Sequence, residues 1–564
     1  MRKKQLGQIF LGLVGLLVFN LLAQQYFFRI DLTEEQRYSL HPATRQILKN
    51  LEVDIVVKVY LEGEFPPDFQ RLQKAVRETL DEFKAYAGRR LTYRFIDPSV
   101  AKNEKERNQR YRELYEKGIL PTNVFAKEEG QRVEKIIFPG AVLTAYDPRA
   151  EKTFETTALL FKVIDQKVQG APSPAQILNQ SVENVEFNLI SAIRQLTQSK
   201  KRRVGLVEGH GELENVEMAT IIERLQEYYE VVKIPLPLEP RVKEGVDALI
   251  IAKPDSAFLE EDKLKIDQYI MQGGKVLFFA DVVGVYMDSV LRDKGSFTFP
   301  VEHNLLDMFF KYGVRLNPTL IKDLNAGLIP IVVGNIADGR PNIQPLPWTY
   351  YPLLNNFGKH PITKNLGPVQ ARYISTMDTV KAPGIRKTPL IFSSQYARII
   401  PTPTEVLYEE ERRPPDPRLF NQGPLPVAYL LEGAFSSVYK SRPFSKRPGF
   451  RAKGKPTKLL ICADGDLIRN DTARNGQPVP LGFDMIRQTT YSNADFLLQA
   501  LDYMMDEQGV IGAKNKEIVL RPLDKIKLKE ARTYWQVFNL GLPLLSIALL
   551  GFVFFFWRKR TYQR

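Results

Sequence analysis

The stretch that decides the fold reads Val204-Gly-Leu-Val-Glu-Gly-His-Gly-Glu-Leu213, an apolar strand that runs into a glycine-rich turn. A helix is expected next, because apolar residues recur at helical spacing at Met218, Ile221, Ile222, Leu225 and Tyr229. A strand at 248–252, a helix at 260–271 and a strand at 275–281 continue the pattern. This alternation predicts an α/β domain with a doubly wound parallel sheet and crossover helices.

Working outward, the same domain extends towards the C-terminus. Residues 458–463 form a largely apolar strand that ends in Asp464-Gly-Asp466, and a helix is expected at 494–505. Between them, residues 285–455 are rich in proline, which predicts a long, loop-rich insertion. We therefore expect one α/β domain over 201–525 with an insertion at about 285–455.

The N-terminal part, residues 27–165, has its own pattern. Expected strands and helices follow the order β-α-β-α-β-β, which resembles a thioredoxin-like domain. Residues 61–66, where such a domain would carry its redox pair, contain no thiol, so a scaffold role remains. Residues 166–200 are expected to be a connector and a helix.

Composition limits the chemistry. The 564 residues are 44% hydrophobic and 26% charged, a globular balance that excludes a disordered or polytopic membrane protein. The single cysteine, Cys462, excludes an internal disulfide and a cysteine-rich zinc site. The chain has no P-loop and no G-x-S-x-G nucleophile turn, and Glu214 stands where a dinucleotide loop needs its third glycine. We expect no enzyme activity, no catalytic residues, no cofactor and no bound metal.

Two apolar segments lie near the chain ends. Residues 6–23 follow Arg2, Lys3 and Lys4 and are long enough to span a bilayer, which needs at least about 17 residues. A cleaved signal peptide has the same layout, but no clear cleavage site follows, so an uncleaved helix over 1–26 is favoured. Residues 537–557 carry no charge and are flanked by aromatic residues, which predicts a second transmembrane helix over 534–558.

The charges beside these segments predict the topology. Cations precede the first segment, and Arg558, Lys559, Arg560 and Arg564 follow the second. The positive-inside rule then puts both termini in the cytoplasm of a bacterium, with the bulk of the chain periplasmic at the inner membrane. That compartment disfavours nucleic acid as a partner. The formal net charge of +14 fits contact with anionic lipid or a cell-wall polymer, or else bland surface charge.

Polar residues at strand ends form the one candidate ligand or partner surface. It consists of Glu208, His210, Glu212, Asp464 and Asp466. The carboxyl ends of parallel strands meet at one sheet edge, where open α/β sheets bind ligands. The acidic residues near 464–471 could instead hold a cation or, more simply, cap helices.

Several further segments carry a family resemblance. They are Arg29-Ile-Asp-Leu-Thr-Glu-Glu-Gln-Arg-Tyr-Ser-Leu40, Glu208–Leu213, Tyr312–Pro318, His360–Thr363, Leu430–Gly433, Asp464–Asp466 and Leu481–Asp484. In these the chain resembles the gliding motility-associated ABC transporter auxiliary (substrate-binding-like) proteins, the GldG family of the Bacteroidetes type. The resemblance implies a polytopic ABC permease and a cytoplasmic ABC ATPase as partners. It also implies a class I glutamine-amidotransferase-like fold without its catalytic residues, and it leaves a homodimer open.

Two functions are therefore expected. The first is a membrane-anchored, non-catalytic accessory subunit of an ABC-type complex associated with gliding motility and the cell envelope. The alternative is a periplasmic binding protein or residual hydrolase that acts on a cell-wall or glycan ligand at the sheet edge.

Overall fold

The computed structural model describes residues 15, 39–63, 65–128, 131–147, 152–161, 173–197, 200–287, 289–290, 295–336, 338–408, 410–515 and 529–562. The transmembrane helix expected over 1–26 lies outside the described residues except for Gly15, as does the connector at 166–172. The chain divides into two compact units, and their described parts are residues 39–515 and 529–562. Each unit is described by itself.

A small domain opens the first unit with a four-stranded sheet in the order β2-β1-β5-β6. The strands are β1 (Asp54–Val59), β2 (Leu91–Phe95), β5 (Gly140–Asp147) and β6 (Lys152–Leu159). Strand β1 is parallel to β2 and antiparallel to β5. Its alternating side chains Ile55, Val57 and Val59 are buried, so one face of the sheet packs into the core.

Helices flank this sheet. They are α2 (Pro42–Lys49), α3 (Pro67–Ala87), α4 (Glu104–Glu116) and α5 (Pro174–Thr197). Helix α3 packs against α5, and the α3 side chains Leu72, Val76 and Leu80 are fully buried. Strands β3 (Thr122–Glu128) and β4 (Gln131–Ile137) form a separate hairpin. Strand β6 was not expected, because this edge strand is rich in threonine and charge rather than in apolar residues.

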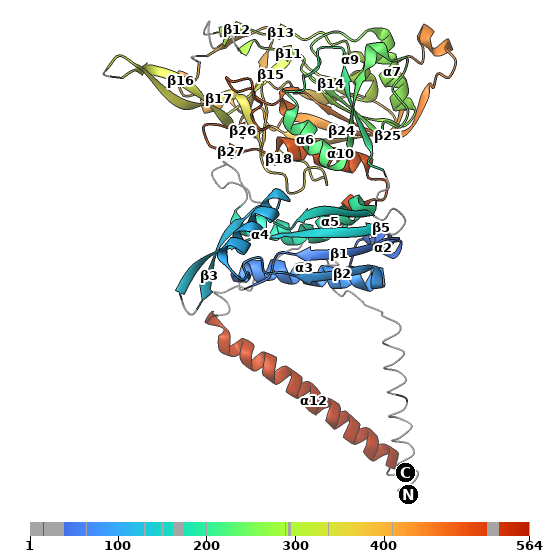
Figure 1. Cartoon of the computed structure of the whole chain (residues 1–564), viewed down its shortest axis with the longest axis vertical. Helices are drawn as coiled ribbons and strands as arrows, with labels where there is room; N and C mark the ends of the chain where they lie inside the picture. Colours follow the sequence, from blue (N-terminus) through green and yellow to red (C-terminus); the bar gives the residue numbers. More distant parts are fainter. Residues whose placement is uncertain are drawn as a thin grey trace. The chain divides into compact units, whose positions relative to one another are not determined.

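The large domain is built on an eight-stranded sheet in the order β18-β21-β24-β25-β10-β9-β7-β8 (Figure 1). Five strands are parallel: β7 (Arg203–Glu208), β8 (Glu230–Pro235), β9 (Ala248–Ala252), β10 (Lys275–Phe279) and β25 (Lys453–Cys462). Three antiparallel strands extend it: β24 (Pro426–Ser436), β21 (Ile385–Phe392) and β18 (Asn356–Phe357). The mixed α/β class and the parallel core agree with the sequence prediction.

Both faces of this sheet are buried, because alternate side chains enter two different cores. Leu249, Ile251 and Phe278 join helices α7 (Glu260–Met271) and α9 (Leu306–Tyr312) in one core. Ala248, Ile250 and Phe279 join α6 (Ala219–Tyr228) and α10 (Asn493–Met505) in the other. All five residues of β9 are buried, as expected for a central parallel strand.

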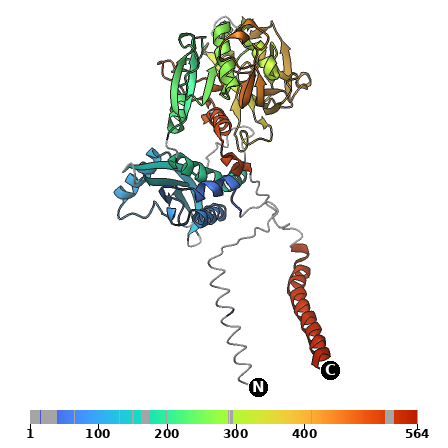
Figure 2. The same cartoon turned by 90° about the vertical axis from the view of Figure 1, so that its right-hand side faces the viewer.

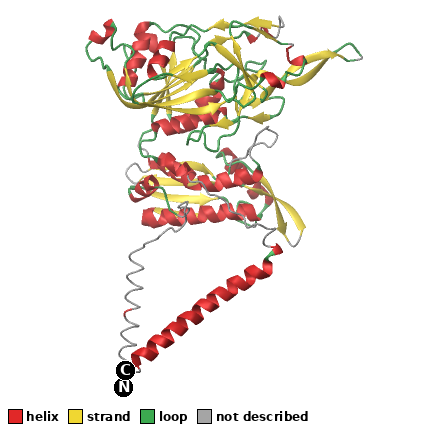
Figure 3. Cartoon of the chain, turned by 180° about the vertical axis from the view of Figure 1, so that it is seen from behind, coloured by secondary structure: helices red, strands yellow, loops and turns green. Residues whose placement is uncertain are grey.

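The segment 285–455 differs from the loop-rich insertion that we expected. It supplies β18, β21 and β24 to the central sheet. Its prolines do not prevent this, because Pro401 ends a strand, Pro424 precedes β24, and Pro389 lies at a register shift in β21. Figures 1 and 3 show a long hairpin of β16 (Ala326–Asn335) and β17 (Pro341–Leu354) that extends from the domain.

Short strands in two- and three-stranded sheets make up most of the remainder. They are β11 (Val283–Gly284), β12 (Gly295–Phe297), β13 (Phe299–Pro300), β14 (Val314–Leu316), β15 (Thr319–Asp323), β16 (Ala326–Asn335), β17 (Pro341–Leu354), β19 (Val369–Gln370), β20 (Met377–Thr379), β22 (Ala397–Pro401), β23 (Glu405–Leu407), β26 (Phe483–Asp484) and β27 (Thr489–Thr490).

Polar contacts join the two domains of the first unit. Arg194 of α5 forms an ion pair with Asp506, the residue after α10, at 3.2 Å. Glu183 of α5 lies 3.8 Å from Lys364 of the large domain. The 3₁₀ helix η7 (Val510–Asn515) continues from α10 and packs against α5 and α2. Helix α5 therefore packs in the core of the small domain and also forms ion pairs with the large domain.

The second unit contains helix α12 (Arg532–Tyr562), drawn in red in Figure 2. Its residues 532–560 have a mean hydropathy of 2.2 over their most apolar window, and that window is not buried. Among the described residues this is the one helix long and apolar enough to cross a membrane. The expected C-terminal segment, 534–558, lies inside it.

Because the central sheet is buried, replacing a leucine inside it should lower the free energy of unfolding far more than replacing an exposed leucine. Leu249 of β9 is fully buried, whereas Leu238 is 83% exposed. We expect Leu249→Ala to lower the free energy of unfolding of the large domain by about 2–5 kcal/mol, because it leaves a cavity. Leu238→Ala should change it by less than about 0.5 kcal/mol. Chemical denaturation of the two variants tests this, and equal effects would contradict the assigned core.

Candidate functional site

The strand order locates the functional edge of the large sheet. From β7 the chain passes to β8 on one side and then to β9, β10 and β25 on the other. The reversal lies between β7 and β9. Open α/β sheets bind ligands beyond the carboxyl ends of the strands at such a switch point. The turns that begin at Gly209 and Lys253 are therefore the first place to look for a site.

His210 is buried among Glu212, Phe258 and Asp262. Its side chain is 3% exposed, and its ring stacks on Phe258 with 3.6 Å between centroids. The Nε2 atom lies 3.1 Å from Asp262, and Nδ1 lies 3.3 Å from Glu212. The backbone N–H of His210 also donates to Glu212 at 2.7 Å. Histidine and glutamate therefore hold each other and the turn in place.

The glycines of this turn make room for the neighbouring loop. Gly211 has φ +71°, and a Cβ there would fall 1.6 Å from the Asp255 carboxylate. The carbonyl of His210 accepts hydrogen bonds from the N–H groups of Asp255 and Ser256. The loop after β9 thus occupies the space beside the turn. This packing supports a tight βα turn at Gly209 and Gly211.

A second group of charges lies beyond β10 and β25. Lys253 Nζ lies 2.8 Å from Asp281 and 2.5 Å from Asp466. Asp281 also accepts the Gly465 N–H at 2.7 Å. Asp464 is fully buried and accepts N–H groups from Arg372 and Asp466 at 2.8 and 2.7 Å. Each of these carboxylates thus accepts a hydrogen bond from another part of the chain, and these bonds connect the loops that follow β9, β10 and β25.

Burial shapes the charge state of this group. Burial, reinforced by the charges of Asp281 and Asp466, raises the pKa of Asp464 well above its usual value. Burial disfavours the charged form of Lys253, but its two carboxylate partners outweigh that and raise its pKa. Burial opposes ionisation of Asp466 too, yet Lys253 and Arg372 leave its pKa lowered. The lysine stays charged because the carboxylates surround it.

The five residues singled out in the sequence do share one edge, but they do not form one site. Strands β7 and β25 are separated by β9 and β10, which is three strand spacings or roughly 14 Å. His210 and Glu212 belong to one group, and Asp464 and Asp466 to the other. Glu208 stands apart in an exposed ion pair with Lys233 of β8.

The sequence reasoning missed the residues that hold these groups together. Lys253 and Asp281 come soon after β9 and β10, so the rule about strand ends, applied to every parallel strand, would have found them. Asp262 and Arg372 reach the edge from a helix and from a distant loop. No local signal marks them.

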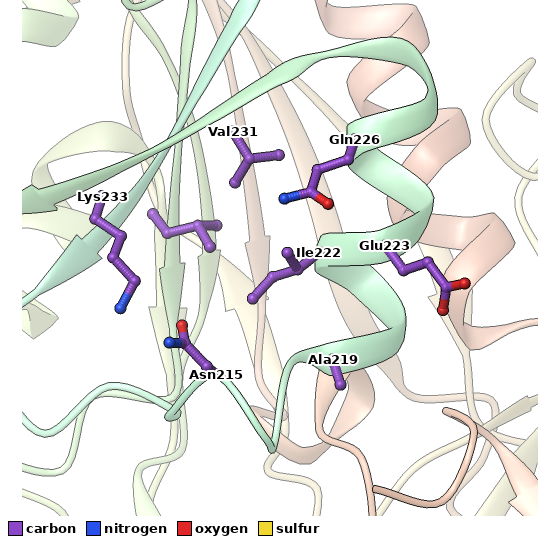
Figure 4. Close-up of a pocket in the computed structure, with 8 residues that line it drawn as sticks. Asn215, Ala219, Ile222, Glu223, Gln226, Val231 and Lys233 are labelled. Carbon is purple, nitrogen blue, oxygen red and sulfur yellow. The ribbon is translucent and has the colours of Figure 1, made fainter.

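The open hollows of this region lie to one side of the buried groups. One depression of about 490 Å³ runs between α6 and β8 and is lined by Leu206, Ile222 and Val231 together with polar side chains (Figure 4). A neighbouring depression of about 520 Å³ is lined by Glu208, Glu212 and Lys233 among others. Neither is lined by His210, Asp464 or Asp466. Of the two buried groups, only Glu212 borders a hollow, and its side chain is 2% exposed because it is held by His210.

Comparison with known proteins identifies the class. Residues 201–500, more than half of the chain, match a family model described as "ABC-type uncharacterized transport system". The chain therefore belongs to this family of auxiliary components of ABC-type transport systems, and the family implies association with the other components of such a system. Residues 34–144 match a "Domain of unknown function (DUF7088)".

Individual relatives add little. An uncharacterized protein of Borreliella burgdorferi is 22% identical over 391 residues, which is 65% of this chain and 66% of the relative. The match thus spans slightly less than two thirds of that relative's length. A solved structure, the mmIFT52 N-terminal domain, is 12% identical and covers 56% of this chain and all of that chain, at a TM-score of 0.30. So low a TM-score supports no conclusion about fold.

The ion pairs of Lys253 predict a pH-dependent loss of stability. Lys253→Met leaves Asp281 buried without its paired cation, whereas Asp466 keeps Arg469. This should cost about 3–5 kcal/mol of unfolding free energy at pH 7–8. Burial already raises the pKa of Asp281, and loss of the lysine raises it further above its unfolded value, so protonation at lower pH relieves the defect. Denaturation at pH 8 and pH 5 should show a smaller deficit at pH 5.

Lys233→Met is the matched control, because Lys233 is 50% exposed and pairs with the exposed Glu208. It should cost less than about 1 kcal/mol at either pH. A deficit of Lys253→Met that grows towards pH 5 would contradict the ion-pair assignment.

Proposed function

We propose that this chain is a non-catalytic accessory subunit of an ABC-type membrane complex associated with gliding motility and the cell envelope. Its large periplasmic region binds partner subunits or transmits conformational change. One observation carries the proposal: the carboxyl edge of the sheet is occupied by the chain's own side chains. His210 is held by Asp262 and Glu212, and Lys253 by Asp281 and Asp466.

The proposed partners are a polytopic permease and a cytoplasmic ATPase, and nucleic acid is not among them. Both termini lie in the cytoplasm and the bulk is periplasmic at the bacterial inner membrane. Support comes from family membership and from α12, whose apolar span carries Tyr534 and Trp535 near one end and three cations, Arg558, Lys559 and Arg560, at the other. The link to gliding motility rests on the sequence segments that resemble the GldG family.

The proposed fold of each domain suits a scaffold. The small sheet, ordered β2-β1-β5-β6 with one parallel pair, supports a thioredoxin-like domain that lacks a thiol. The parallel order β8-β7-β9-β10-β25 supports an amidotransferase-like domain without its nucleophile. Cys462 lies inside β25, and burial raises the pKa of its thiol well above the usual value. A buried, protonated thiol is a poor nucleophile.

One observation favours the alternative, a binding protein or residual hydrolase for a cell-wall or glycan ligand. The depression lined by Glu208, Glu212 and Lys233 opens beside the turn that carries His210. A sugar ligand would find the exposed carboxylates of Glu208 and Glu214 and the cation of Lys233 there. The Glu212 carboxylate, by contrast, is held by His210. This candidate needs the exposed pair Glu208 and Lys233 for binding, whereas the accessory role does not.

Co-purification tests the accessory role. The tagged full chain, extracted with a mild detergent, should carry a permease and an ATPase with it, because the chain supplies no transport machinery of its own. Recovery of the chain alone would contradict the proposal. A double variant, Glu208→Ala with Lys233→Ala, is the control for the alternative. It should fold, assemble with the partner subunits and support gliding motility as the wild type does. Loss of function with intact assembly would favour ligand binding at the depression.

The proposed topology predicts where a reporter at the C-terminus will lie. A fluorescent protein that matures only in the cytoplasm, fused after Arg564, should be fluorescent, because the cations after the apolar span stay on the cytoplasmic side. The same reporter inserted at exposed Gly339 in the turn of the β16–β17 hairpin should stay dark. The reverse pattern would overturn the topology.

A further inference from the structure

The net charge of +14 is concentrated in three places. Residues 437–455, here called the basic loop, carry seven lysines and arginines and no carboxylate. Residues 2–4 carry three more cations, and residues 558–564 carry four. These fourteen account for the whole excess, so the rest of the chain has equal numbers of basic and acidic residues. Residues 200–203 form another cationic run, but there Arg202 and Arg203 pair with Glu507 and Glu230. The basic loop, by contrast, carries half of the excess and no carboxylate of its own.

The basic loop follows β24, includes the first three residues of β25, and is anchored on helices α7 and α9. The Tyr439 hydroxyl donates to Glu260 at 2.9 Å, and Arg442 contacts Glu260 and Asp307 at 3.1 and 2.8 Å. Arg447 pairs with Glu261 at 2.5 Å. These contacts use two of the seven cations. They hold the loop in one arrangement, so little ordering entropy remains to be lost on binding.

The other five cations are exposed and have no ion-pair partner among the residues that the structure describes. They are Lys440, Lys446, Arg451, Lys453 and Lys455. Five unpaired cations on one anchored loop produce a local positive potential that nearby carboxylates do not cancel. Four of the five are lysines, which act as mobile point charges rather than as rigid bidentate donors.

The loop offers no apolar anchor. Phe444 and Phe450 are half-buried, and Arg447 lies over the Phe444 ring at 4.6 Å. The exposed large apolar side chains of the described chain include none from residues 437–455. Stable protein interfaces have an apolar centre, and membrane-surface segments insert apolar side chains. The attraction that this loop can exert is therefore almost wholly electrostatic.

We propose that the basic loop binds a linear anionic polymer, not a polypeptide, whose repeating units carry carboxylate or phosphate groups. A row of mobile lysines matches repeated charge along a flexible chain, because each lysine can follow a different unit without a shaped pocket. Binding releases counterions and weakens as salt rises. This inference goes beyond the proposed accessory role and does not depend on it, since the loop and the carboxyl edge of the sheet use different residues.

A binding experiment tests it with the full chain in neutral detergent. Fluorescent polygalacturonate and long-chain polyphosphate serve as probes. The wild-type chain should bind both, more weakly as salt rises. Replacing the five unpaired cations by Gln should weaken binding at least about tenfold at low ionic strength. Thermal unfolding should be unchanged, because all five side chains are exposed.

A second five-residue variant gives the matched control, because it removes the same charge from exposed lysines elsewhere. It replaces Lys84, Lys105, Lys311, Lys359 and Lys381 by Gln. It should retain wild-type affinity, and equal loss in both variants would overturn the proposal. Vesicles of phosphatidylglycerol and poly-glutamate serve as competing probes. Loop-dependent binding to either of these, without binding to the two polymers, would also overturn it in favour of a bilayer or an acidic protein.

Discussion

The ion pairs of Lys253 with Asp281 and Asp466 are the constraint on which the functional edge depends. They tie the ends of β9, β10 and β25 together at the place where an α/β sheet ordinarily opens to a ligand. A buried lysine between two carboxylates does not add much net stability over an apolar substitute, but it tolerates no missing partner. The buried charges that the structure describes at this edge are thus bonded to one another.

Local sequence patterns predicted the elements that are buried on both faces. Strand β9, helix α7 and most of α10 have the expected limits, because long apolar runs and regular helical spacing leave few alternatives. Strands β6 and β8 were not expected. Both lie at sheet edges, where one side of the strand faces solvent and the apolar signal is weak. The prolines of 285–455 suggested loops, although several of them lie at strand ends or at a register shift.

The sequence correctly predicted which edge of the sheet carries the candidate residues, but it did not predict which residues bond to them. Glycines and carboxylates directly after a strand are visible in the sequence, and the topology alone brings them to one edge. Asp262, on helix α7, and Arg372, between two short strands, reach that edge only through tertiary packing. The distinction between an open site and a filled one depends on these distant residues, so it required the structure.

The position of η7 has a mechanical consequence. This short helix follows α10 of the large domain after residues 506–509, packs on α5 and α2 of the small domain, and is followed in the chain by residues 516–528 and then α12. A force applied to the chain beyond residue 515 therefore reaches η7 first. Because η7 packs on the small domain and is linked within a few residues to α10 of the large domain, both domains are loaded through the same short segment.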